Sequence, residues 1–148
     1  MGNGRALVYL NGGSDPGLPQ ALYTLLQGNG YGVDTATEAQ QGVHFLDRTN
    51  YSLVVTTPNG SAGPSNVSLY KRVVALAPEI RRNVFLVLVG TEFNSGDGTQ
   101  AFAAMADLVL HPKDVANASD LLQSTVSERT RLFQAFQEAQ ARLDRRRY

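Results

Sequence analysis

The sequence predicts an α/β domain built on a doubly wound, five-stranded parallel sheet. Four short runs are almost wholly apolar, which is typical of strands that are covered on both faces of a parallel sheet. They are Ala6–Leu10, Tyr51–Thr56, Val84–Val89 and Leu108–Leu110. A weaker fifth run, Gly32–Thr37, carries more polar residues. Because helical patterns separate the runs and crossovers between parallel strands are right-handed, we expect the strand order 2-1-3-4-5.

The gaps between these runs hold apolar residues at helical spacing. The first stripe runs from Leu18 to Leu26 and stops at Gly28, a typical helix end. Further stripes are Ala39–Leu46, Leu69–Ala77 and Ala101–Met105. Pro78 is expected to end the third helix. Asn117, three residues before Asp120, resembles the cap that begins a fifth helix.

The fifth helix is predicted to continue well beyond the length needed to cover a sheet. The segment from Ser127 to Tyr148 contains no glycine and no proline. Apolar residues recur in it at spacings of four, three and four, as in a coiled-coil seam. They are Leu132, Phe136, Ala139 and Leu143. We therefore predict a domain at residues 1–131 and a helical extension at residues 132–148.

Two interpretations of this apolar seam are open. In the first, the helix folds back on its own domain or frays after Arg131. In the second, it pairs with the same helix of a second copy, as a parallel dimer or as a rod that leads to a following domain. Leaving apolar side chains in water costs about 25 cal/mol per Å², so we expect something to cover the seam. We favour the homodimer, because the seam is short and contains Ala139.

Composition argues against several classes of function. Thirteen basic and thirteen acidic residues give zero net charge, so no nucleic-acid partner is expected. The absence of cysteine excludes a disulfide framework, a thiol nucleophile and a cysteine-rich zinc site. No run approaches the roughly 20 apolar residues that cross a bilayer, and the first ten residues do not resemble a signal peptide. We expect a cytoplasmic protein with no membrane partner.

Two glycine-rich segments and two histidines are the candidates for a ligand-binding or catalytic site. Asn11–Gly17 and Gly90–Gln100 each follow a predicted strand. The first lacks a phosphate-loop ending, so we expect a simple turn there and a flexible connection at the second. His44 is expected near the surface, and His111 as a hydrogen-bonded structural residue. No nucleophile–base pair or set of metal ligands accompanies them, so we expect no enzymatic activity, cofactor or metal.

The order of elements, with "LVLHP" closing the fifth strand, resembles the CheY-like receiver domain of bacterial response regulators, which has a flavodoxin-like fold. The resemblance covers roughly Arg5 to Arg129 and rests on element order more than on motifs. The positions that match the receiver's working residues are Asn11, Gly12, Thr57, Val89, Gly90, His111 and Pro112.

Only the proline among these positions keeps the receiver's residue type. The acidic pair that binds magnesium is replaced by Asn11 and Gly12, and the aspartate that accepts a phosphoryl group by Thr57. Val89 or Gly90 stands for the threonine or serine after the fourth strand. His111 and Pro112 stand for a Lys-Pro pair, for which the resemblance implies a cis peptide bond.

The resemblance therefore implies a degenerate receiver, or pseudo-receiver, that has lost the aspartyl-phosphate switch. Receivers commonly present the face made by their fourth helix, fifth strand and fifth helix to a partner signalling protein, and we expect the same face to be used here. The main alternative is a domain that binds a small, nucleotide-like molecule in the crevice at the C-terminal strand ends. An enzyme of flavodoxin-like fold ranks lowest, because no nucleophile is paired with a base.

Overall fold

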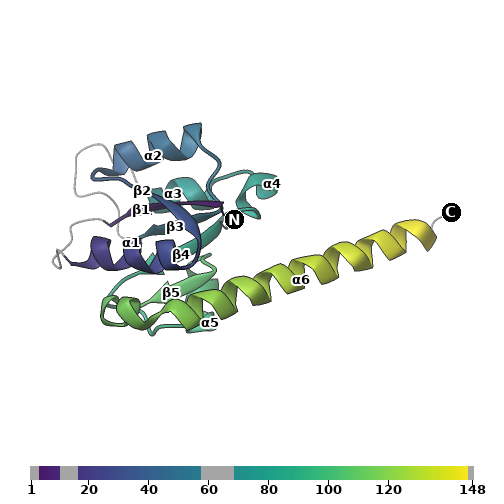
Figure 1. The fold of residues 1–148 in the computed structure, drawn as a ribbon. Coiled ribbons are helices and arrows are strands. Elements are labelled where there is room, and N and C mark those ends of the chain that lie inside the picture. Colours follow the sequence, from purple (N-terminus) through teal and green to yellow (C-terminus); the bar gives the residue numbers. More distant parts are fainter. Residues whose placement is uncertain (1–3, 11–16, 58–68, 147–148) are drawn as a thin grey trace.

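The computed structural model describes residues 4–10, 17–57 and 69–146 (Figure 1). Its elements in chain order are β1 (Gly4–Tyr9), α1 (Leu18–Gly28), β2 (Tyr31–Thr35), α2 (Ala39–Arg48), β3 (Leu53–Thr56), α3 (Leu69–Val74), α4 (Pro78–Arg81), β4 (Phe85–Val89), α5 (Gly98–Ala103), β5 (Leu108–Leu110) and α6 (Ser119–Arg146). A 3-10 helix, Pro112–Asn117, lies between β5 and α6.

The five strands form one parallel sheet in the order β2-β1-β3-β4-β5, which confirms the prediction. β3, β4 and β5 are buried along their whole length, because helices cover both faces of the sheet. The register aligns Thr56 with Tyr9 on one side and with Leu88 on the other. The C-terminal ends of the central strands therefore meet at one edge.

The sheet separates two hydrophobic cores, because successive strand residues point to opposite faces. The first core joins α1 and α6 to the sheet, and its buried members include Val8, Leu22, Val55 and Leu122. The second joins α3 and α5 to the other face, and its buried members include Leu7, Val54, Leu69, Val73 and Ala101. The apolar stripes of α1 and α3 thus correspond to faces that these helices bury, whereas in the stripe Ala101–Met105 only Ala101 is buried, and Phe102 and Met105 are exposed.

The helix boundaries differ from the prediction at three places. The third helix ends at Val74, and Pro78 begins the short helix α4 instead of ending a longer one. Proline is favoured in a first helical turn, where its missing N–H has no partner to lose. Asn117 belongs to the 3-10 helix, so α6 begins at Ser119. Gly98 already lies in α5, within the segment expected to be a flexible connection.

The prediction of a cis bond between His111 and Pro112 is wrong, since the described residues contain no cis peptide bond. Pro112 lies in the first turn of the 3-10 helix, and His111 is its extended N-cap residue. A trans bond with proline's fixed φ suits this entry into a helix.

The extended C-terminal helix is confirmed. α6 is one continuous helix of 28 residues, and its second half extends away from the other elements (Figure 1). Leu132 and Leu143 are 65% and 60% exposed, and Ala139 is also exposed. The side chain of Phe136 is outside what the structure describes. The division at residue 131 stays a prediction. No described helix combines the length and the apolar character that a membrane span requires.

Candidate functional site

The C-terminal edge of the sheet holds the described positions that match a receiver's working residues. Thr56 ends β3 and is 1% exposed. Thr57 follows it and is half-buried, at the position where the resemblance to receivers implies the phosphoacceptor aspartate. Asn11 and Gly12 lie outside the described residues. The topology therefore brings Thr57 to the expected edge, and what it offers there is a hydroxyl and not a carboxylate.

The end of β4 also lacks the threonine or serine that the resemblance to receivers implies there. Val89 is 1% exposed and belongs to the first core, so it offers this edge no polar group. The N–H of Gly90 donates to the carbonyl of Leu110 at 3.0 Å. The Glu92 carboxylate lies against Gly90, where an added Cβ would be 2.6 Å from Glu92 Oε1. No feature of the sequence indicated this position for the carboxylate.

His111 is held in a hydrogen-bonded network at the end of β5. Its backbone N–H donates to Ser95 Oγ at 2.9 Å, and Ser95 Oγ in turn donates to Asp114 Oδ2 at 2.6 Å. His111 Nδ1 accepts from the N–H of Lys113 at 3.2 Å and so caps the 3-10 helix. This is the structural role expected for the histidine. His44 is exposed, also as expected.

The segment after β4 is fixed to α5 by Gln100 and Asp97. The Gln100 side chain donates to the carbonyl of Glu92 at 3.1 Å and accepts from the N–H of Asn94 at 2.7 Å. Asp97 caps α5 by accepting from the N–H of Gln100 at 3.0 Å. These contacts replace the flexible connection that was expected. Within the described ranges, no three His, Asp or Glu side chains gather into a possible metal site.

One face of the domain is made by α5, β5 and the first half of α6, and we call it the α5–β5–α6 face. It corresponds to the receiver's fourth helix, fifth strand and fifth helix, since α4 is an additional short helix. A cavity of about 330 Å³ lies between α5 and α6, and its lining includes Ala101, Thr125 and Leu132. On α5 and just after it, Phe102 and Met105 are 87% and 66% exposed.

Four residues fasten α6 to the sheet, and we call them the helix root: Arg81, Phe85, Asp107 and Arg129. Arg129 Nε is 3.2 Å from Asp107 Oδ1, and Arg81 Nη1 is 3.5 Å from Asp107 Oδ2. Asp107 Oδ2 also accepts from the N–H of Leu86 at 2.8 Å. Arg129 donates to the backbone carbonyl of Arg82 and lies over the Phe85 ring. The sequence did not reveal this cluster.

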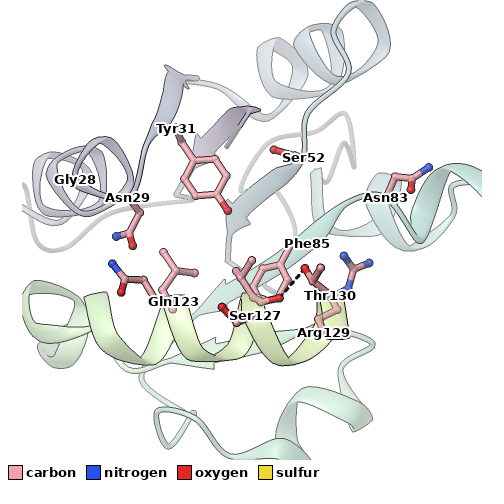
Figure 2. A pocket seen from close by; sticks show the side chains of 12 residues that line it. Gly28, Asn29, Tyr31, Ser52, Asn83, Phe85, Gln123, Ser127, Arg129 and Thr130 are labelled. Carbon is pink, nitrogen blue, oxygen red and sulfur yellow. Dashed lines mark hydrogen bonds between the residues drawn. The ribbon is translucent and has the colours of Figure 1, made fainter. Parts of the chain in front are cut away.

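A cavity of about 610 Å³ lies between the end of α1 and the first half of α6 (Figure 2). It is at the N-terminal edge of the sheet, opposite the edge that holds Thr57. Figure 2 shows Asn29, which follows α1, and Gln123, from α6, on facing sides of it. The Tyr31 ring lines it as well, and burial raises the pKa of the Tyr31 hydroxyl. Among the described residues that line it, Arg129 is the one that carries a charge.

A second charged cluster joins β1, β2 and the start of β3. Arg5 Nη2 is 2.6 Å and 2.7 Å from the two carboxylate oxygens of Asp34. The Tyr51 hydroxyl donates to Asp34 Oδ2 at 2.7 Å. The hydrogen bond from Arg5 lowers the pKa of Asp34. Burial, and then the bond to Asp34, raises the pKa of Tyr51 to about 12.

Comparison with solved structures finds the same topology in receiver domains. The chemotaxis response regulator CheY4 of Vibrio cholerae matches with a TM-score of 0.55 and 15% identity, over 82% of this chain and 98% of that one. The signal receiver domain of an HD domain-containing protein from Pseudomonas fluorescens Pf-5 matches with a TM-score of 0.58 and 15% identity, over 88% of this chain and 92% of that one. The isolated REC domain of RcsB from Salmonella enterica serovar Typhimurium matches with a TM-score of 0.53 and 12% identity, over 86% of this chain and 99% of that one.

The chain has a CheY-like receiver fold. No protein-family model matches the sequence, and no curated protein matches it significantly. At 12% to 15% identity, the likeness to these receiver domains establishes the fold alone. What the receiver-like chain does must therefore be argued from its own residues.

Proposed function

We propose that this receiver-like chain is a pseudo-receiver, a protein–protein interaction module of bacterial signal transduction that is not switched by aspartyl phosphorylation. The observation that carries the proposal is Thr57, which directly follows β3, where the resemblance to receivers implies an aspartate that accepts the phosphoryl group. A hydroxyl cannot form the acyl phosphate that an aspartate forms. In this proposal the module acts in the cytoplasm, and it has no enzymatic activity, metal or cofactor of its own.

The surrounding positions support the same conclusion. Phosphoryl transfer to a receiver requires a divalent cation, which neutralises charge and prefers carboxylate oxygens. Asn11 and Gly12, at the positions of the acidic pair, have no carboxylate. At the end of β4, Val89 is buried in the core and Gly90 has no side chain to follow a phosphoryl group. The loss of several cooperating groups is more specific than the loss of one.

Intact-mass spectrometry tests this part of the proposal. The protein is incubated with acetyl phosphate and magnesium, next to a receiver domain that retains its aspartate as the positive control. The mass of this chain is expected to stay unchanged while the control gains one phosphoryl group. Gain of a phosphoryl group on Asp15 or Asp97 would show that another carboxylate has taken over, and the pseudo-receiver proposal would fail.

Two surfaces are available for protein contacts in this proposal. The α5–β5–α6 face, with Phe102 and Met105 exposed, is proposed to bind a partner signalling protein. The second half of α6, with the seam Leu132, Phe136, Ala139 and Leu143, is proposed to form a homodimer. Light scattering on the full chain and on a version cut after Arg131 tests the dimer. Only the full chain should be dimeric, and equal behaviour of the two would exclude α6 as the dimerisation element.

Small-molecule binding is the second candidate function. The cavity of Figure 2 favours it, but this cavity lies at the N-terminal edge of the sheet and not in the expected crevice at the C-terminal strand ends. Its volume of about 610 Å³ lies within the usual range for ligand pockets, about 300–1,000 Å³. Thermal shift against nucleotides, cyclic dinucleotides, flavins and acyl phosphates would detect a ligand. Gln123→Ala should reduce the shift if the ligand binds in this cavity, and Gln134→Ala, on the exposed second half of α6, is the matched control. An unchanged shift in Gln123→Ala would place the ligand elsewhere.

A further inference from the structure

Two heptad series run along α6 from its start to its far end. In each series the residues are seven apart, so they follow one stripe of the helix with a drift of about 20° per heptad. The first series is Ala118, which directly precedes α6, followed by Thr125, Leu132 and Ala139. The second series is Leu122, Arg129, Phe136 and Leu143. The last two members of each series form the apolar seam.

The first two members of each series face the domain body, by which we mean the described residues before Ala118. Ala118 and Leu122 are 3% and 2% exposed and belong to the first core. Thr125 is half-buried, and Arg129 is fastened at the helix root. Leu132, by contrast, is 65% exposed. The seam is therefore the continuation of the same stripe into a region where the body no longer covers it.

This continuity restricts how a second copy of α6 can approach. In a parallel pair, each residue lies opposite its own equivalent along the whole stripe. Leu122 of the second copy would then lie opposite Leu122, on the side where the sheet already packs. A parallel pair that follows the stripe is therefore blocked by the domain bodies.

We infer that two copies of the chain associate through an antiparallel pair of α6 helices. Leu132 then lies opposite Leu143 of the second copy, and Phe136 opposite Ala139. The overlap is the part of the stripe that the domain body leaves uncovered, from Leu132 to Leu143, which is about 17 Å of helix. The two domain bodies lie at opposite ends of the pair, where neither obstructs the other.

Side-chain volume also favours the antiparallel order. Pairing a large residue with a small one keeps the layers of a helical interface evenly filled. The antiparallel pair sets Phe136 opposite Ala139 in both central layers. A parallel pair would set Phe136 against Phe136 in one layer and Ala139 against Ala139 in another. One of those layers would be crowded and the other would leave a void.

Disulfide trapping tests this orientation, which rests on the proposed α6 dimer. The chain has no cysteine, so Leu132→Cys and Leu143→Cys each introduce a single thiol. In a glutathione buffer, a mixture of the two variants should form the mixed disulfide at least tenfold in excess over either self-disulfide. Gln134→Cys, at an exposed position on the opposite side of the helix, is the control and should not be trapped. Self-disulfides of Leu132→Cys and of Leu143→Cys would overturn the orientation.

A second measurement requires no substitution of a seam residue. A nitroxide label on Gln123→Cys, at an exposed position outside both series, reports the distance between the two copies by pulsed electron resonance. The antiparallel pair predicts a separation of roughly 40 Å. A parallel pair predicts about 10 Å, which would overturn the inference. A monomer by light scattering would overturn the proposed dimer itself, and with it the orientation.

Discussion

The guanidinium of Arg129 lies over the ring of Phe85, with 5.7 Å between Cζ and the ring centroid. Arg129 belongs to α6, and Phe85 is the first residue of β4. The same guanidinium pairs with Asp107, which comes shortly before β5. One side chain therefore fastens the long helix to two strands at the point where the helix leaves the domain body.

Replacing Arg129 with alanine should lower the free energy of unfolding by about 1–2 kcal/mol. The variant loses a cation–π contact, about 0.5–1 kcal/mol, and a half-exposed ion pair of up to about 1 kcal/mol. Urea unfolding measures the change. Arg131→Ala, at an exposed position two residues further along, is the control and should be close to neutral. Equal effects of the two substitutions would contradict the anchoring role of Arg129.

The pairing of Asp34 with Arg5 should make stability depend on acid pH. The pKa of Asp34 is lower in the folded state than in the unfolded chain, where it is about 3.9. Its contribution is therefore fully present above that value and is lost as the pH falls through the folded-state pKa. The stability difference between the natural chain and Asp34→Asn should shrink as the pH falls below the unfolded-state value of about 3.9. A difference that stays constant as the pH falls would contradict the assignment.

Gly96 and Gly98 should respond differently to alanine. Gly96 has φ +79°, and an added Cβ would lie 3.3 Å from Leu121 Cδ1. Gly96→Ala should therefore destabilise the chain by about 1–2 kcal/mol, the cost of left-handed backbone in an L-residue. Gly98 begins α5 and has open space around its Cα, so Gly98→Ala should be neutral or stabilise by up to about 1 kcal/mol. Chemical unfolding of the two variants and of the natural chain measures these changes in the free energy of unfolding.

Restoring the aspartate alone should not restore the phosphorylation switch. Thr57→Asp supplies the missing carboxylate, but Asn11 and Gly12 still offer the cation no acidic ligand. Intact mass after treatment with acetyl phosphate and magnesium should therefore match that of a Thr57→Asn control. Phosphorylation of the Thr57→Asp protein would show that the cation site survives with other ligands, for which Glu92 is the first candidate.

The sheet could be predicted because its strands are short, apolar and buried on both faces. β5 was predicted with its observed bounds, Leu108–Leu110, and the strand order follows from the handedness of crossovers. Pro78 was misinterpreted, because proline is found both after a helix and in the first turn of the next one. Local sequence signals do not separate these two cases.

The sequence predicts which residues of the candidate site lie at the same edge of the sheet, but it does not predict which side chains contact each other there. Topology alone places Thr57, Val89 and His111 at one edge of the sheet, because parallel strands end together. The pairing of Asp107 with Arg129 joins side chains far apart in the sequence, so no periodic pattern reveals it. The placement of Glu92 against Gly90 depends on a side-chain rotamer, which sequence spacing does not determine.

The continuous helix beyond Arg129 has the length and the single attachment point of a lever arm. From Arg129 to Arg146 it measures about 26 Å, and its unbroken backbone hydrogen bonds make it stiff. A tilt of about 10° at the helix root would move the far end by roughly 4–5 Å, close to the rise of one helical turn. A partner that shifts Arg129 by a small amount would thus produce a mechanical displacement at the tip that is large enough to change which residues meet there.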